Sequence, residues 1–253
     1  MNNYSVPNLV KACEILKVLS SKADGISANE LEELVQVPRT SAFRILKTLC
    51  AEGMAEKRGK LFFSGPGLVQ IGLNSLRSME IRSLSIPFLR ELAIRTDFTA
   101  HLAVSNGGQS LILEVYDSPN PVRVASRPGT IVPFYSSSTG KVFLAFRYER
   151  ELEDYFAQHS CEKLTPNTIV TLEEMRQEVD RIKRDGFAVD NQEFHDDVHC
   201  LAAPVRDSTS EVVAAIGVTG PTVQFTSQKQ TDVSVLVKKA AEELSRVIGY
   251  KVE

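Results

Sequence analysis

Residues 27–52, with the sequence SANELEELVQVPRTSAFRILKTLCAE, decide the fold of the first part of the chain. They predict two short helices joined by a tight turn. Ser27, followed three residues later by Glu30, fits a capping box, in which both side chains satisfy free amides where a helix begins. Pro38 suits the first position of the second helix because it lacks an N–H that would have no partner there. Gly53 is expected to end that helix in the left-handed conformation.

Apolar residues recur at helical spacing in both helices and leave one face polar. The positions expected to be buried are Leu31, Leu34 and Val35 in the first helix and Ala42, Ile45, Leu46 and Leu49 in the second. The positions expected to face outward in the second helix are Arg39, Thr40, Ser41, Phe43, Arg44, Lys47 and Thr48. A helix with a packed back and a front of hydroxyl and basic groups suits the DNA major groove. The pattern therefore predicts a helix-turn-helix.

Two flanking segments extend this prediction to a winged helix-turn-helix domain over residues 1–66. Residues 54–57 and 61–63 read as short strands around Arg58-Gly59-Lys60, a basic turn that can lie along a phosphate backbone. Another helix begins near Pro7, and its expected buried positions are Leu9, Ala12, Ile15, Leu16 and Leu19. That helix would complete a three-helix core.

The distribution of charge favours DNA as the partner of this domain. The whole chain has a net charge of -3, but residues 1–66 hold nine Lys or Arg against seven Asp or Glu. Positive charge concentrates between Arg39 and Lys60, and for nucleic-acid binding its location matters more than the total. The residues expected to contact DNA are Ser27, Arg39, Thr40, Ser41, Arg44, Lys47, Lys57, Arg58 and Lys60.

Composition indicates an ordinary globular protein of a reducing compartment. The four cysteines, Cys13, Cys50, Cys161 and Cys200, include no C-x-x-C pair, which argues against a disulfide framework or a zinc ribbon. No apolar run approaches the length of a membrane span, and the polar first residues lack the features of a signal peptide. We expect a cytoplasmic protein without membrane attachment, metal or cofactor.

The chain changes character after Pro66-Gly67. A linker helix is expected over residues 67–82, and a second domain over residues 83–253. Strands are expected over residues 99–105, 109–116, 122–126, 201–206 and 212–218, with Asn106-Gly107-Gly108 as a hairpin turn. Helices are expected over residues 83–96, with Pro87 in the first turn, and over residues 142–146, 149–158, 172–186 and 228–248. This interleaving predicts an α+β domain around a mainly antiparallel sheet.

Motifs in both parts of the chain carry a family resemblance. The front holds Ser41-x-x-Arg44-x-Leu46-x-x-Leu49-x-x-x-Gly53. The back holds Thr139-Gly140-Lys141-Val142-Phe143-Leu144-Ala145 and Gly186-x3-Asp190-x2-Glu193-x6-Cys200-Leu201-Ala202-x2-Val205-x-Asp207. On these motifs nearly the whole chain resembles the IclR family of bacterial transcriptional regulators. The resemblance implies a C-terminal effector-binding domain of the GAF/PAS type and homodimers that often pair as dimers of dimers.

An effector pocket needs apolar walls and a few convergent polar groups. Residues 137–140 form a hydroxyl-rich loop that opens a helix, where free amides favour an anionic ligand. The resemblance adds positions that hold small organic acids in relatives. The candidate polar contacts are Ser137, Ser138, Thr139, Gly140, Asp190, Cys200, Gly217 and Thr219, and the candidate walls are Val124, Val132 and Val198.

These observations together predict a metabolite-responsive regulator that binds a pseudo-palindromic double-stranded DNA operator as a homodimer. Repression of a catabolic operon is the expected outcome, with activation as the alternative. The effector would be a small organic acid, a sugar acid or an aromatic compound.

Other interpretations of the same residues stay open. His199 and Cys200 could suggest a thiol enzyme, but adjacent residues on a strand point to opposite faces. No phosphate loop, dinucleotide fingerprint or serine elbow supports an enzyme. A metal sensor could use His195, His199 and Cys200, although their spacing is not that of a structural zinc site. The Ser/Thr loop could be only a helix cap, Cys200 only a buried apolar residue, and the basic hairpin only a solvated turn.

Overall fold

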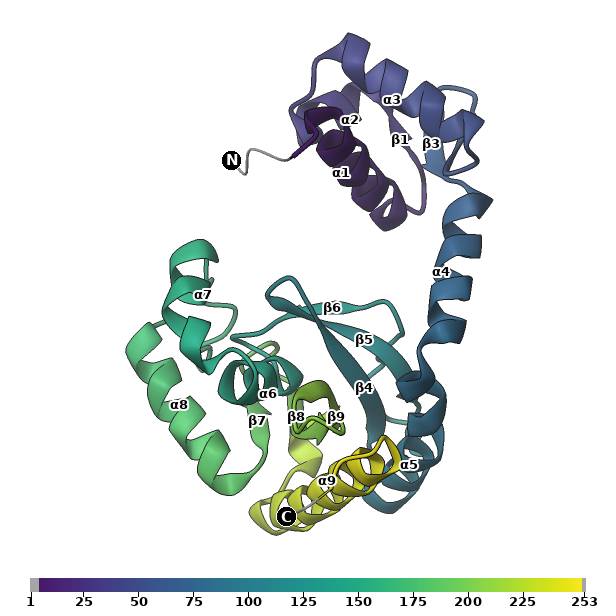
Figure 1. Cartoon of the computed structure of the whole chain (residues 1–253). Helices are drawn as coiled ribbons and strands as arrows, with labels where there is room; N and C mark the ends of the chain where they lie inside the picture. The colour runs from purple at the N-terminus through teal and green to yellow at the C-terminus, as the bar shows by residue number, and fades with distance from the viewer. Residues whose placement is uncertain (1–4, 252–253) are drawn as a thin grey trace. The chain divides into compact units, whose positions relative to one another are not determined.

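The computed structural model describes residues 5–251 and divides the chain into two compact units, Met1–Met79 and Glu80–Glu253 (Figure 1). The division falls within the segment expected to be the linker. There α4 (Pro66–Ser78) ends, and α5 (Glu80–Thr96) begins after the single residue Met79. The expectation of one helix continuing beyond residue 79 is therefore wrong, because the backbone of Met79 leaves the helical conformation.

The first unit is a winged helix-turn-helix. In addition to α4, it contains α1 (Pro7–Ser21), β1 (Ile26–Ser27), α2 (Ala28–Val35), α3 (Arg39–Ala51), β2 (Ala55–Arg58) and β3 (Leu61–Ser64). The strands form an antiparallel sheet in the order β1-β3-β2. Ile15 of α1, Leu31 of α2 and Leu46 of α3 are fully buried in one core. This core fixes the outward face of α3 relative to the β2–β3 hairpin.

Local signals at the helix ends explain where α2 and α3 begin and end. The Ser27 hydroxyl accepts from the Glu30 amide at 3.3 Å, and the Glu30 carboxylate accepts from the Ser27 amide at 2.9 Å, which confirms the capping box. Gly53 has a φ of 70°, as expected for the residue that ends α3. Pro38 is the N-cap of α3 and not its first helical residue, because its ψ of 137° is extended.

Two apolar residues expected in the core are on the surface. Leu9 is 62% exposed because the N-terminal half of α1 extends beyond the core, whose buried positions in α1 are Ile15 and Leu19. Leu34 is 59% exposed. The eight-residue α2 packs through Leu31 and Val35, one turn apart, and this turns Leu34 away from the core.

The second unit is a six-stranded antiparallel sheet of order β6-β5-β4-β9-β8-β7. After α5 its elements are β4 (Thr99–Asn106), β5 (Gln109–Tyr116), β6 (Ile131–Pro133), α6 (Ser138–Phe146), η1 (Glu149–Glu151), α7 (Leu152–Gln158), α8 (Leu172–Asp185), β7 (Ala188–Asn191), β8 (Val198–Arg206), β9 (Val212–Pro221), η2 (Thr222–Gln224) and α9 (Ser227–Val247). Helices α5 and α9 cover one face of the sheet, and α6, α7 and α8 lie on the other (Figure 1). Within residues 5–251 no helix combines the length and apolar character required to cross a membrane.

The α+β class and the antiparallel sheet are as predicted, but several elements differ. Residues 122–126 form no strand, and the edge of the sheet is β6 instead. Helix α6 begins at Ser138, four residues earlier than expected, because the Ser137 hydroxyl caps the amide of Gly140. Pro87 lies inside α5 and not in its first turn, since this helix already begins at Glu80.

Candidate functional site

The outward face of α3 and the β2–β3 hairpin enclose a basic cleft of about 780 Å³. Its lining includes four cationic residues, Arg39, Arg44, Lys57 and Lys60, and no carboxylate. Ser27 and Thr40 line the same cleft and add hydroxyl groups. We call this surface the basic cleft. Its charge is complementary to a phosphate backbone, and the α3 side chains are free to reach base edges.

Three residues predicted to bind DNA lie outside the basic cleft. Ser41 is half-buried on the side of α3 that faces α1, and Lys47 is exposed six residues further along α3. The Arg58 guanidinium is held by Glu56 at 2.7 Å and lies over the ring of Phe63. Arg58 is therefore less free to contact a phosphate than Lys57 or Lys60.

The second unit contains a cavity of about 200 Å³, which we call the sensor cavity. One row of residues across three strands forms its floor: Asp190 of β7 lies opposite Cys200 of β8, and Cys200 lies opposite Thr219 of β9. The Cys200 thiol donates to the Thr219 hydroxyl at 3.2 Å. Three predicted contact residues that are far apart in the sequence thus meet because their strands are neighbours.

The first turn of α6 supplies a second side of the sensor cavity. Ser137, Ser138 and Thr139 line it, and all three are buried. The Ser137 hydroxyl accepts from the Gly140 amide, and the Ser137 carbonyl accepts from the Lys141 amide. The amides of Ser138 and Thr139 belong to the first positions of the helix, which have no intrahelical partner. This turn can therefore accept an anion.

The walls of the sensor cavity are mainly apolar. Val124, Val132 and Val198, the three candidate wall residues, all line it. Val124 belongs to the irregular segment over residues 122–126, whose position is set by the Thr99 hydroxyl, which donates to the Val124 carbonyl at 3.0 Å. The lining residues that the sequence did not indicate are His101, Ile112, Ala125, Ser126, Thr130, Phe194 and His195.

Two predicted contact residues, Gly140 and Gly217, do not line the sensor cavity. A Cβ atom on Gly140 would lie 2.2 Å from the Cα of Phe134, and one on Gly217 would lie 2.2 Å from the carbonyl oxygen of Leu201. Both glycines are required by close backbone packing beside the cavity. Their role as ligand contacts stays a prediction.

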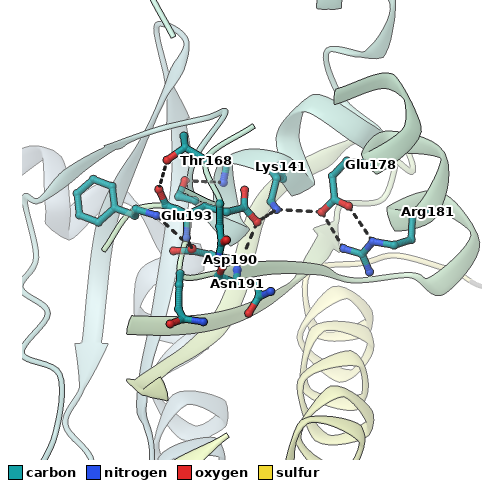
Figure 2. Close-up of polar contacts among 12 residues, drawn as sticks. Lys141, Thr168, Glu178, Arg181, Asp190, Asn191 and Glu193 are labelled. Carbon is teal, nitrogen blue, oxygen red and sulfur yellow. Dashed lines mark hydrogen bonds and ion pairs between the residues drawn. The ribbon is translucent and has the colours of Figure 1, made fainter. Parts of the chain in front are cut away.

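Behind the cavity, Lys141 forms a buried ion-pair network with two carboxylates (Figure 2). Its ammonium donates to Glu178 at 2.9 Å and to Glu193 at 2.5 Å, and the Lys141 side chain is fully buried. Burial opposes ionisation of Glu178, but the bonds from Arg181 and Lys141 hold the pKa of Glu178 below its ordinary value. The network joins α6 and α8 to the turn after β7, and so positions the α6 first turn beside Asp190.

Asp190 lies where this network meets the cavity floor. Its Oδ1 atom accepts from the amides of Glu193 at 2.7 Å and Phe194 at 3.3 Å. Burial raises the pKa of Asp190 to about 6, although these amide bonds oppose the shift. Burial also raises the pKa of the Cys200 thiol well above its ordinary value, so Cys200 stays protonated at neutral pH.

We expect Asp190→Asn to gain stability relative to the wild type as the pH rises from 4 to 7. The pKa of Asp190 is higher in the folded chain than in an unfolded one, so its carboxyl destabilises the fold increasingly through this range. Asparagine keeps an oxygen for both amides and does not titrate. The difference in unfolding free energy should grow by up to roughly 3 kcal/mol, measured by urea unfolding at both pH values. A difference that does not change with pH would contradict this prediction.

His199 and Cys200 lie on opposite faces of β8. The His199 ring packs on Phe225 at a centroid distance of 4.4 Å, away from the sensor cavity that Cys200 lines. His199 therefore cannot act as a base for the Cys200 thiol, which is also kept protonated by burial. The same separation prevents His195, His199 and Cys200 from meeting at one metal ion, and the described residues contain no other cluster of three potential ligands.

Two family matches cover both units. Residues 8–59 match the "IclR helix-turn-helix domain", and residues 73–246 match "Bacterial transcriptional regulator IclR C-terminal". The first match contains α2, α3 and β2. The second contains every strand of the larger sheet and the whole sensor cavity.

Individual relatives have similar lengths and folds. The HTH-type transcriptional repressor AllR of Escherichia coli K12 is 25% identical over 245 residues, which are 96% of this chain and 90% of AllR. The HTH-type transcriptional regulator KdgR of Dickeya chrysanthemi is 28% identical over 97% of this chain and 81% of KdgR. The crystal structure of Thermotoga maritima IclR is 30% identical and has a TM-score of 0.72, covering 96% of this chain and 99% of that one.

Proposed function

Because this chain belongs to the IclR family of bacterial transcriptional regulators, we propose that it is a repressor whose affinity for its operator changes when a small organic acid occupies the sensor cavity. A helix-turn-helix regulator of this family binds DNA, so the basic cleft is the DNA-facing surface of the proposal. Repression is proposed because AllR, a relative along nearly the whole chain, is a transcriptional repressor. A regulator of transcription works in the cytoplasm, where the chromosome is.

In this proposal α3 enters the major groove and presents Arg39, Thr40 and Arg44 to base edges. Lys57 and Lys60 of the hairpin, together with Lys47, contact phosphates on either side. Ser27 caps α2. In this proposal the start of α2 lies close to the DNA backbone. Ser41 and Arg58 contribute less, since one is half-buried and the other is paired with Glu56.

The operator is proposed to be pseudo-palindromic and the protein a homodimer, with pairs of dimers as the larger assembly. Helix α4 supports self-association because none of its residues is buried in the first unit. Val69 and Leu73, one helical turn apart, are each more than half exposed. Such a pair of apolar side chains is suited to packing against a second copy.

The effector is proposed to be a small carboxylate with an apolar body, drawn from organic acids, sugar acids or aromatic acids. The observation that carries this proposal is the first turn of α6: Ser138 and Thr139 line a cavity with mainly apolar walls, and their amides occupy helix positions that have no intrahelical partner. A ligand there contacts the α6 turn and the strand floor together. Ligand binding can alter DNA affinity only by favouring one arrangement of the units. A coupling free energy of a few kcal/mol between ligand binding and DNA binding is enough to change operator affinity substantially.

We expect Thr139→Val to weaken carboxylate binding about tenfold and to leave operator affinity without effector unchanged. Valine has nearly the same shape but removes a hydroxyl that lines the sensor cavity. The measurement is a thermal-shift titration with monocarboxylates, followed by mobility shift on the DNA upstream of the protein's own gene. Thr231→Val, on the exposed side of α9, is the control. Equal carboxylate binding by the Thr139 variant would contradict the proposed site, and the absence of salt-sensitive binding to any neighbouring intergenic fragment would contradict the operator.

A further inference from the structure

His101 is a buried polar residue of the sensor cavity. It lies on the central strand β4 and is 5% exposed, yet it lines the cavity. Its Nδ1 atom has no hydrogen-bond partner among the described residues. Burial lowers the pKa of His101 to about 4, so the ring is neutral at physiological pH and carries one donor and one acceptor.

The strand register places His101 on the same face as the cavity floor. Thr99 lies opposite Thr219, and His101, two residues further along β4, lies opposite Gly217. Residues two apart on a strand share a face, so His101 stands beside the row formed by Thr219, Cys200 and Asp190.

The His101 ring lines the cavity and its Nδ1 atom has no partner among the described residues, so an occupant of the cavity is an available hydrogen-bond partner for the part of the ring that faces it. The cavity lining contains no Lys or Arg, and Lys141 is held behind it by two carboxylates. One anion can be accepted at the first turn of α6, but a second one beside His101 would be buried without a counter-charge. The group beside His101 must therefore be neutral and able to form hydrogen bonds.

From this geometry we propose that His101 is a specificity-determining residue that recognises a hydroxyl group on a small monocarboxylate effector. The inference rests on the proposed function, because the carboxylate of the same ligand lies at the first turn of α6. A hydroxyl both donates and accepts, so it pairs with either tautomer of the neutral ring. A cavity of about 200 Å³ accommodates a single aromatic ring or a short chain with these two groups.

The test compares wild type with His101→Leu and His101→Asn by isothermal titration and thermal shift. The probes are benzoate, the three monohydroxybenzoates and terephthalate, and pentanoate, 5-hydroxypentanoate and glutarate. In the wild type we expect at least one hydroxylated acid to bind about tenfold more tightly than its parent acid, and the dicarboxylates to bind more weakly. In His101→Leu that preference should disappear while the parent acid binds as before. His101→Asn keeps a polar group and should restore part of the preference.

His199→Leu is the matched control, because His199 is another buried neutral histidine but lies on the opposite face of the sheet. It should keep the wild-type preference, and circular dichroism and operator binding verify that each variant is folded. Monocarboxylate binding without a hydroxyl preference, or a preference that persists in both His101 variants, would overturn this inference and leave the proposed function intact. Tighter binding of the dicarboxylates would also overturn it. If no carboxylate binds the wild type, the carboxylate site itself is wrong and this inference falls with it.

Discussion

Replacing Arg44 by alanine is expected to lower operator affinity by roughly ten- to a hundredfold while ligand binding stays unchanged. Arg44 is exposed on α3 and lines the basic cleft, whereas Ala42 and Leu46 on the same helix are buried. The side chain therefore contributes little to folding and is placed to reach a base edge. Fluorescence anisotropy with the upstream fragment measures the loss, and a carboxylate titration verifies that the second unit is intact.

Two further variants distinguish recognition by Arg44 from a general effect of charge. Arg150→Ala removes an exposed arginine from the other unit and should leave operator affinity unchanged. Lys47→Ala should weaken binding to all DNA sequences alike and reduce the slope of log affinity against log salt by about 1. An Arg44 variant with wild-type operator affinity would show that α3 does not read the DNA as proposed.

Replacing Lys141 by methionine is expected to destabilise the second unit by about 3–5 kcal/mol. Lys141 is fully buried and pairs with Glu178 and Glu193, and the second carboxylate oxygen of Glu193 has no partner among the described residues (Figure 2). Removing the ammonium leaves Glu193 buried without its counter-charge. The unfolding midpoint in urea, followed by circular dichroism on the full chain, measures the effect.

The chain offers a matched control and a rescue for this prediction. Lys183→Met removes an exposed ammonium paired with Glu149, and a surface pair of this kind contributes at most about 1 kcal/mol. Adding Glu193→Gln to Lys141→Met removes the unpaired charge and should recover part of the lost stability. A Lys141 variant as stable as the Lys183 variant would mean that the network does not hold α6 in place.

Features that depend on nearby residues could be predicted from the sequence. Some features depend only on residues within about one helical turn. These include the capping box of Ser27 and Glu30 and the left-handed Gly53, and the structure contains both. The hydroxyl-rich turn at the start of α6 was recognised for the same reason, since Ser137 caps its own helix. These local signals were enough to locate the basic cleft and one side of the sensor cavity.

Features that depend on packing between distant segments could not be predicted in this way. Residues 122–126 have the composition of a strand but form none. The Thr99 hydroxyl donates to the Val124 carbonyl, and the segment forms one wall of the sensor cavity. The requirement for glycine at residue 217 also depends on a distant segment, because the Leu201 carbonyl leaves no room for a Cβ atom there. His101 was missed because one histidine in an apolar strand resembles a core residue. The available signal is the spacing of Thr99 and His101, which are two residues apart on a strand and therefore share a face. This spacing indicates a cavity residue only when the neighbouring strands are known.

The irregular segment over residues 122–126 has a consequence for how such regulators diversify. The floor and the α6 turn are fixed by strand pairing and by the buried lysine, so changes there endanger the fold. The Val124 segment is held beside them without being part of the sheet. Mutations and changes of length in this segment can therefore alter which compound the cavity recognises. They have little effect on the folding stability of the rest of the molecule. Descendants of one ancestral regulator can thus acquire responses to new nutrients by altering a single wall.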